Sequence, residues 1–532
     1  MGQLKIKNCL ALEFVLLVFF LKTVPAGSAE AAMNINVDGN GGADYTSIQE
    51  AVNHSKSGDT ILVFSGTYTE NVDVDKELTI ISKSGNPEDT IVQAADPGYH
   101  VFCVTASNVT ISGFNVTGAN STGKSREPCG IYLDGRPEIF RTPERDLDNG
   151  IEKGGDGEVT EEVDGKVDEG IDGEVDGGVD GKVDREANEG VNSEVDDGVY
   201  ACTITNNIIS NNILGIFLEE ADSNTLSNNT ASNNYIAIFL AASDNNVLKD
   251  NTASDNKGGV FMFGGANNTF NENRILSSGT GFLLEYYSSN NIFSNNAALD
   301  NENGFYIRGA ENITLINNNA SSNNETGICL DSSSNNTLKG NRADLNRKYG
   351  IHLNHFSWNN VLRNNTASRN EDGIMLYYYS ENNSLSGNTA NLNSKNGFYL
   401  NETAGNTLES NTANSNSGHG IYLKSSTFNT LNNNTVNSNN LYGIYLDPSN
   451  NKTVNTRIVT ADFKYCRFLE DSSNNNTVSG NYLSSNSEAI VANYSENNIY
   501  DNHFDGKTTP ETPFASRVTA VIDRIRDFLT AP

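Results

Sequence analysis

A block of about 23 residues recurs along the chain between Thr203 and Ile499. Each copy reads roughly G-I-x-L-x, then a polar turn that ends in Asn, then T-L-x-x-N and T-A-S-x-N. Steps of 22 to 24 residues separate the aligned positions, which are Thr203, Thr225, Val247, Thr269, Ile292, Thr314, Thr337, Val361, Ser384, Thr407, Thr430, Thr453, Thr477 and Ile499. A unit this short cannot bury a core alone, so the copies must stack into a solenoid.

The apolar residues of G-I-x-L-x alternate, and this period of two indicates a strand rather than a helix. Ile216 and Leu218 exemplify its second and fourth positions, and Leu226 exemplifies the apolar residue of T-L. If one copy is one coil, each of these positions forms a continuous inward stack. We therefore predict an all-β, single-stranded parallel β-helix. The L-x-x-L-x-L-x-x-N spacing of a leucine-rich repeat is absent.

Asparagine also recurs, four residues beyond the aligned position, from Asn207 to Asn434 in successive copies. Asn tolerates left-handed backbone and can satisfy the amides of a turn. At the inter-strand spacing of about 4.8 Å, each side-chain amide can bond the one above it. We therefore expect an asparagine ladder along the solenoid.

These repeats resemble the right-handed β-helix proteins of the pectin-lyase-like superfamily over roughly residues 34–504. The resemblance is closest to the NosD-type and carbohydrate-binding/sugar-hydrolase repeat families, and in style to surface proteins of methane-forming archaea. It implies a right-handed coil. Such repeats specify a fold and say little about function.

The remaining segments suggest the domain plan. Residues 1–31 are expected to be a secretory signal peptide, with Lys5 and Lys7 before a short apolar run, and no other stretch is apolar enough to span a membrane. Residues 34–133 are expected to form an N-terminal cap and the first coils, with Ser47 and Glu50 as a capping box. Residues 199–504 hold the repeats. An apolar helical face in residues 505–532 predicts a second capping helix after a linker. The localisation that follows is extracellular or at the cell surface.

Residues 134–198 are the acidic exception. They carry 23 of the acidic and 7 of the basic residues of a chain whose net charge is −32, with Asp every four residues and many glycines. We interpret them as an extended, disordered insertion of about 62 residues in one turn. The alternatives are a tolerated loop expansion, a calcium-binding segment or a partner-binding arm. Cys129 and Cys202 flank it, so a disulfide at its base is one option among several. Nucleic acid is excluded as a partner at this charge.

The third and fifth positions of G-I-x-L-x are expected to point outward. The third row is rich in aromatic residues, and the fifth carries carboxylates, amides and cations. Flat rings can stack on sugar rings while polar neighbours bond hydroxyl groups, so we predict a binding face for carbohydrate or a cell-envelope polymer. Its expected residues are Tyr306, Tyr399, Tyr422, Tyr445, Asn401, Lys424 and Asp447. The alternatives are self-association through this row and simple β-propensity of aromatics.

An enzymatic alternative is a polysaccharide lyase or epimerase. Glu285, Arg308, Asp331 and His352 fall on consecutive coils beside Tyr306. Elimination on a uronate needs a base, a group that neutralises the carboxylate and an acid, and these side chains could fill those roles. The compact catalytic motifs of β-helix lyases are absent.

A third alternative follows from the NosD resemblance, which implies copper handling. Cys329, His352 and Met375 occupy the third position of three successive coils, and copper favours such soft ligands. We nevertheless expect no required cofactor, with calcium conceivable at the acidic insertion and copper disfavoured. Non-catalytic polymer binding remains the leading hypothesis.

Overall fold

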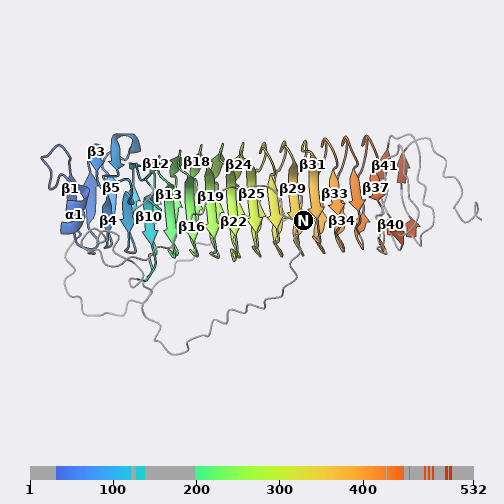
Figure 1. The fold of residues 1–532 in the computed structure, drawn as a ribbon, viewed down its shortest axis with the longest axis horizontal. Helices are drawn as coiled ribbons and strands as arrows, with labels where there is room; N and C mark the ends of the chain where they lie inside the picture. Colours follow the sequence, from blue (N-terminus) through green and yellow to red (C-terminus); the bar gives the residue numbers. More distant parts are fainter. Residues whose placement is uncertain are drawn as a thin grey trace, which may run out of the picture.

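The chain forms a straight parallel β-helix in which successive coils stack into one rod (Figure 1). This computed structural model describes residues 32–121, 127–137, 198–426 and 428–447, and six short strands beyond residue 447. Three parallel sheets run along the rod, and here they are named A, B and C. The predicted all-β solenoid is confirmed.

Sheet C contains the G-I-x-L-x segments and has 14 strands in unbroken chain order. At about 4.8 Å per strand it extends for about 60 Å. The strands are β4 (Val72–Val74), β7 (Phe102–Val104), β10 (Cys129–Asp134), β13 (Leu214–Glu219), β16 (Ile236–Ala241), β19 (Gly258–Phe263), β22 (Thr280–Glu285), β25 (Asn303–Arg308), β27 (Ile328–Asp331), β29 (Tyr349–Asn354), β31 (Asp372–Tyr377), β33 (Phe398–Asn401), β35 (Ile421–Lys424) and β37 (Ile444–Asp447).

Sheet A contains the T-L segments. Its strands are β1 (Asn34–Val37), β2 (Thr60–Val63), β5 (Thr79–Ser82), β8 (Thr110–Ser112), β11 (Thr203–Thr205), β14 (Thr225–Ser227), β17 (Val247–Lys249), β20 (Thr269–Asn271), β23 (Ile292–Ser294), β26 (Thr314–Ile316), β28 (Thr337–Lys339), β30 (Val361–Arg363), β32 (Ser384–Ser386), β34 (Thr407–Glu409), β36 (Thr430–Asn432), β40 (Thr477–Ser479) and β42 (Asn498–Tyr500).

Sheet B contains the T-A-S segments. Its strands are β3 (Gly66–Thr69), β6 (Thr90–Gln93), β9 (Asn115–Thr117), β12 (Ile208–Ser210), β15 (Thr230–Ser232), β18 (Thr252–Ser254), β21 (Arg274–Leu276) and β24 (Ala297–Leu299). From Ala297 to Thr435 single bridges continue the row. Two short pairs lie beyond residue 447: β38 (Val454–Asn455) with β39 (Ser473–Asn474), and β41 (Tyr482–Ser484) with β43 (His503–Asp505).

The predicted register is confirmed from Thr203 to Thr430, where each aligned residue pairs with the next. One position was aligned wrongly, and another lies outside the described residues. Strand β36 pairs directly with β40, and the aligned residue Thr453 is not described. Thr477 pairs with Asn498 rather than Ile499. The repeat is least regular there, which allowed the alignment to slip by one residue.

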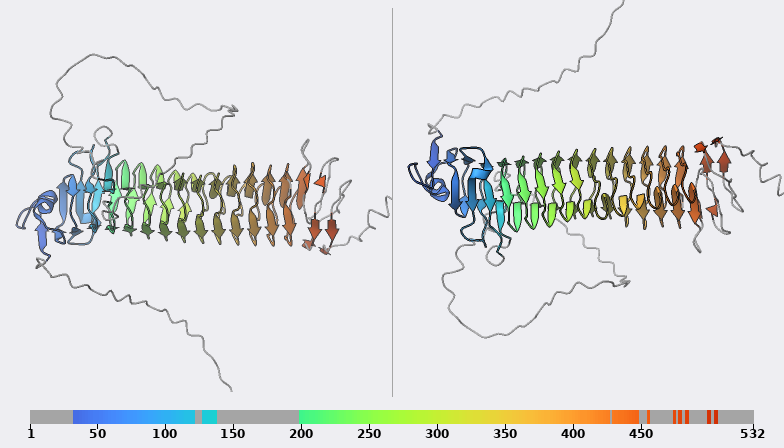
Figure 2. Two further views of the ribbon diagram at one scale, coloured as in Figure 1. Left: turned by 90° about the horizontal axis from the view of Figure 1, so that it is seen from below. Right: turned by 90° about the horizontal axis from the view of Figure 1, so that it is seen from above.

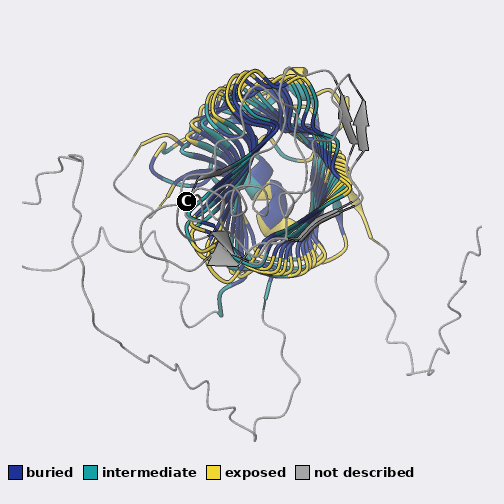
Figure 3. Cartoon of the chain, turned by 90° about the vertical axis from the view of Figure 1, so that its right-hand side faces the viewer, coloured by how far each residue is buried: buried dark blue, intermediate teal, exposed yellow. Residues whose placement is uncertain are grey.

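The inside of the rod is an apolar core, and the exposed residues gather at the corners (Figure 3). The inward stacks predicted from Ile216, Leu218 and Leu226 are fully buried. Asparagine seals the corners. The Asn318 side chain accepts the backbone N–H and the Nδ2–H of Asn296, and donates to Asn341 Oδ1 at 3.0 Å and to the Phe293 carbonyl at 3.0 Å. The predicted ladder is confirmed, and two further corners carry similar asparagine rows.

The N-terminal end of the rod begins with β1, a strand that the sequence analysis did not identify. Helix α1 (Ile48–His54) follows, with Ser47 as its N-cap and Ile48, Ala51 and Val52 buried. The Ser47 hydroxyl accepts the Glu50 N–H as predicted, at 3.2 Å. Figures 1 and 2 show α1 at the outer end of the first strands. The predicted signal peptide and C-terminal helix lie outside the described residues.

The acidic insertion enters and leaves at one corner between sheets C and A. Asp134 pairs with Glu219, and Tyr200 bridges to Asp222. Asp134-Gly135 joined to Val199 would therefore match the ordinary turn Glu219-Glu220-Ala221. Residues 138–197, which hold most of the predicted arm, lie outside the described residues.

Candidate binding face on sheet C

The outward side of sheet C carries rows of unlike side chains along the whole rod. Residues at the third position pair in register from Tyr132 and Phe217 to Tyr422 and Tyr445, and those at the fifth position pair beside them. Many third-row residues are more covered than an outward residue would be: Phe217 is 7 % exposed, Cys329 4 % and Met375 7 %. Close stacking along the row covers them. The row is therefore a packed spine rather than a line of free side chains.

At the C-terminal part of the face, the rings of Tyr399, Tyr422 and Tyr445 stack on one another. The ring centroids of Tyr399 and Tyr422 lie 4.8 Å apart at an interplanar angle of 9°, and those of Tyr422 and Tyr445 lie 5.1 Å apart. Both faces of Tyr422 are therefore covered by its neighbours. The expectation that this ring stacks flat on a sugar does not fit this geometry.

Residues just before the glycine of each copy also join this row, and the sequence analysis missed them. His419 stacks 5.1 Å from Tyr442 and 4.8 Å from Tyr445. Tyr349 packs 4.6 Å from His352. The glycine of each copy could have predicted the position of these residues from the sequence. A Cβ on Gly281 would meet Ala298 and Asn301 inside the coil, so the glycine itself turns inward and the residue before it turns outward.

The fifth-position row beside the tyrosines is polar. Asn401 and Lys424 pair in register, and Asp447 follows, although its side chain lies outside the described residues. Asn401 is 8 % exposed. Its Oδ1 atom is buried and has no hydrogen-bond partner among the described residues. An unsatisfied buried acceptor is costly, and this atom is too deeply buried for a ligand to reach it.

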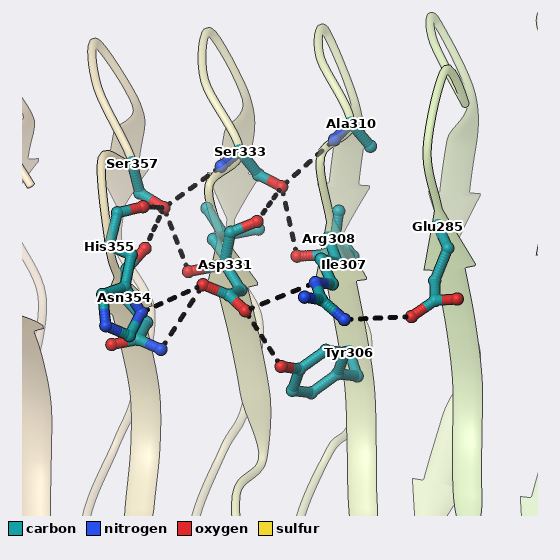
Figure 4. Close-up of polar contacts among 11 residues, drawn as sticks. Glu285, Tyr306, Ile307, Arg308, Ala310, Asp331, Ser333, Asn354, His355 and Ser357 are labelled. Atoms are coloured by element: carbon teal, nitrogen blue, oxygen red, sulfur yellow. Dashed lines mark hydrogen bonds and ion pairs between the residues drawn. The ribbon is translucent and has the colours of Figure 1, made fainter. Parts of the chain in front are cut away.

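Further along the same row, Arg308 lies between two carboxylates (Figure 4). Its Nη1 is 3.8 Å from Glu285 Oε1, and its Nε is 3.9 Å from Asp331 Oδ2. Tyr306 donates its hydroxyl to Asp331 Oδ2 at 3.1 Å, and burial is the largest cause that raises the pKa of this phenol. The predicted cluster of Glu285, Tyr306, Arg308 and Asp331 is thus brought together.

His352 is not brought to Asp331. It lies in the third row, its Nε2 is buried without a hydrogen-bond partner among the described residues, and burial lowers the pKa of its imidazole to about 4. The histidine beside Asp331 is instead His355, whose Nδ1 is 3.4 Å from Asp331 Oδ1. The turn after Asn354 directs His355 back toward the previous coil, which strand alternation alone does not predict.

The three residues considered as copper ligands lie on successive strands of sheet C and are largely covered. Cys329 pairs with His352, and His352 pairs with Met375. Burial raises the pKa of the Cys329 thiol, which keeps it protonated, whereas metals bind the thiolate. Among the residues that the structure describes, no group of three or more His, Cys, Asp or Glu side chains is placed to hold a metal ion.

The N-terminal part of the face contains an ion pair that the sequence analysis did not predict. Arg136 donates to both carboxylate oxygens of buried Asp134, at 2.8 and 2.9 Å, and lies 3.4 Å from Glu219. Tyr132 donates to Glu219. His100 stacks on Tyr132 at 4.4 Å, and burial lowers the pKa of His100 to about 4.

The disulfide considered between Cys129 and Cys202 is not formed. Cys129 opens β10 and packs in the outer cluster with Tyr132, Leu214 and Phe217. Cys202 precedes β11 and faces the main core instead. The two thiols therefore belong to different sheets and different faces of the coil.

Comparison with known proteins finds one matching family model and one relative that is similar over part of its length. The family model described as "Right handed beta helix region" matches residues 189–329 and 289–436. The match covers just under half of the chain, and it agrees with the right-handed parallel β-helix that the resemblance implied. A curated cell surface glycoprotein of Methanothermus fervidus is 33% identical over 128 residues, or 23% of this chain. That match spans only 19% of the length of the relative.

Solved structures with similarity include two epimerases. The A-module of a mannuronan C-5 epimerase from Azotobacter vinelandii is 13% identical, with a TM-score of 0.45 over 75% of this chain and 93% of that one. A periplasmic alginate epimerase is 14% identical, with a TM-score of 0.42 over 58% and 76%. These likenesses are too low to transfer any property to this chain. Across the described residues, no helix has the length and apolarity that would let it span a membrane.

Proposed function

We propose that this chain is a secreted or cell-surface β-helix protein that binds a carbohydrate polymer, without catalysis, along the outward face of sheet C. The observation that carries the proposal is the polar fifth-position row beside the stacked tyrosines, where the partly exposed Lys424 follows Asn401 on the next coil. Polar side chains at a fixed spacing can form hydrogen bonds with the hydroxyl groups of a sugar chain.

The geometry favours contact through hydroxyl groups and amides over contact through the tyrosine ring faces. Tyr399, Tyr422 and Tyr445 stack on one another, so their edges are what a ligand would meet. Lys424 stands next to Asn401 on the following coil. Over these three coils, a polymer lying along the rod would meet one tyrosine and one polar residue about every 4.8 Å. The cell surface glycoprotein relative supports the surface location.

Charge favours a neutral polymer. The chain as a whole carries −32, and Arg308 is shared between the carboxylates of Glu285 and Asp331. A polyuronate would bring further negative charge to a chain that already has an excess of it. We therefore expect neutral polysaccharides to bind better than acidic ones at low ionic strength.

The test is a binding panel of neutral and acidic polysaccharides with residues 32–532 and with the triple variant Tyr399→Ala, Tyr422→Ala, Tyr445→Ala. The triple variant should lose binding while its circular dichroism stays unchanged. A matched control carries Val247→Ala and Ile292→Ala, which remove exposed side chains from the outward side of sheet A. Retained affinity in the triple variant would assign the tyrosine row to packing instead.

A lyase or epimerase is the second candidate, and it rests on the contact of Tyr306 and His355 with Asp331 beside Arg308. If these groups run an elimination, polyuronates should yield unsaturated products that absorb in the ultraviolet, and Asp331→Asn should stop their formation. If no polyuronate in a panel yields such products, with or without calcium, non-catalytic binding would be the better explanation.

A further inference from the structure

Three turns that follow strands of sheet C are one residue longer than the others. Five residues separate Glu285 from Asn291, Asn354 from Asn360 and Tyr377 from Asn383, whereas four separate the equivalent residues in the other seven coils between Glu219 and Asn429. The long turns are also the ones whose first two residues are aromatic: Tyr286-Tyr287, His355-Phe356 and Tyr378-Tyr379.

These aromatic pairs are held in left-handed backbone. The φ angles are 30° and 48° at His355 and Phe356, and 43° and 56° at Tyr378 and Tyr379. Bulky residues rarely adopt this region because the side chain crowds the backbone. Where a four-residue turn places two such residues in succession, it uses Gly264 and Gly265. Other bulky residues such as Leu345, Leu392 and Phe428 also have positive φ, so what sets the long turns apart is that two aromatic residues adopt this backbone in succession.

Two of the long turns lie on successive coils and together form one aromatic surface. We name it the turn platform and define it as His355, Phe356, Trp358, Tyr378 and Tyr379. The Phe356 ring lies parallel to that of Tyr379 within 5°, at 5.8 Å, and 6.0 Å from that of Trp358. Phe356 is 47% exposed, Trp358 44% and Tyr379 37%. Unlike the stacked tyrosine row, this surface exposes large aromatic area.

The platform is also fixed in place and bordered by polar groups. Trp358 Nε1 donates to the Tyr379 carbonyl at 2.6 Å, which ties the two turns together. His355 reaches Asp331 at 3.4 Å, which joins the platform to the polar row of sheet C. A rigid aromatic surface with polar edges loses little conformational freedom when a ligand binds.

We infer that the turn platform is a binding site for the face of a neutral pyranose ring. The C–H face of a sugar ring is apolar, and its hydroxyl groups would meet the phenols, His355 and Asp331 around the rings. A second copy of the chain is a poorer occupant because two chains of charge −32 repel each other. An anionic lipid surface is disfavoured for the same reason. The site lies outside the tyrosine row and does not depend on it.

The chain has a built-in reporter for this site, because Trp358 is its single tryptophan. Residues 32–532 would be titrated with β-1,4-linked hexasaccharides of glucose, mannose and N-acetylglucosamine while tryptophan emission is recorded. At least one of them should shift the emission saturably. No change with any of the three, up to 10 mM, would overturn the inference.

The variant Phe356→Ser with Tyr379→Ser keeps Trp358 and should weaken that titration at least tenfold. The matched control is Tyr287→Ser, which changes the same position of the third long turn, three coils away, and should leave it unchanged. Equal affinity of the double variant, or an equal loss in the control, would contradict the assignment. Substitution of Tyr399, Tyr422 and Tyr445 should leave the Trp358 response intact, so the platform and the tyrosine row can fail independently.

Discussion

The two faces of sheet C are built from the same strands but follow different rules. Inward positions repeat nearly the same residue on every coil, as the row from Ile216 to Ile444 shows. Outward positions do not: Phe217, Cys329, His352 and Tyr422 all occupy one row. Inward residues must all be apolar and of similar size because they stack in one core, whereas outward residues are not held to one chemical type. Repetition therefore specifies the fold, and the non-repeating outward positions are where we look for a binding site.

The largest effect is expected inside, at the asparagine ladder. Asn318→Ala removes both acceptor bonds to Asn296 and leaves the Phe293 carbonyl buried without its donor. We expect a loss of about 3–5 kcal/mol in the free energy of unfolding, because buried polar groups left unpaired cost about 1–3 kcal/mol each. Urea denaturation measures this loss. A loss below about 1 kcal/mol would show that the ladder is dispensable.

Two buried histidines should make the free energy of unfolding depend on pH. The pKa values of His100 and His352 are lowered to about 4, from an ordinary value near 6.5. Between these values the unfolded chain binds more protons, so stability is fully present above pH 6.5 and falls as the pH drops toward 4. Each histidine would contribute up to about 3 kcal/mol of that loss.

Thermal unfolding of His352→Leu between pH 7 and 4 checks this effect. Leu283 occupies the same row three coils earlier, so leucine fits the position. The variant should flatten the pH profile. An unchanged profile would mean that His352 is solvated and titrates normally.

The sequence located the fold because the inward rows repeat, and it located the site only in part. Arg308, Asp331 and Tyr306 were brought together as strand alternation predicts. His355 was not predicted to reach Asp331, because its position depends on an extra turn residue. The covered faces of Tyr422 depend on ring orientation, which the repeat leaves open. Where turns vary in length, strand register no longer predicts side-chain position.

A smaller effect is expected from the acidic insertion, which lies outside every inward row. Deleting residues 138–197 keeps the contact between Arg136 and buried Asp134. The melting temperature should change by less than about 2 °C, with or without calcium, because the deletion removes none of the described core residues. A large loss would show that the arm packs on the rod and would refute the loop-expansion interpretation.

The smallest effect is a gain in stability. Tyr287 is 90% exposed with a φ of 61°, so its ring adds little packing while its backbone is strained. Tyr287→Gly should stabilise the rod by up to about 1 kcal/mol, since glycine adopts this backbone freely. Chemical denaturation measures the change, and a clear destabilisation would show that the ring has a partner.

The most direct test of the outward face compares two triple variants for the polysaccharide that the wild-type chain binds best. Replacing Tyr399, Tyr422 and Tyr445 by Phe keeps the stacked rings and removes only the hydroxyl groups. Titration calorimetry should show at least a tenfold loss of affinity, close to that of the triple Ala variant, while the melting temperature stays within about 2 °C of wild type. Wild-type affinity in the triple Phe variant would contradict binding through the edges of the tyrosine row.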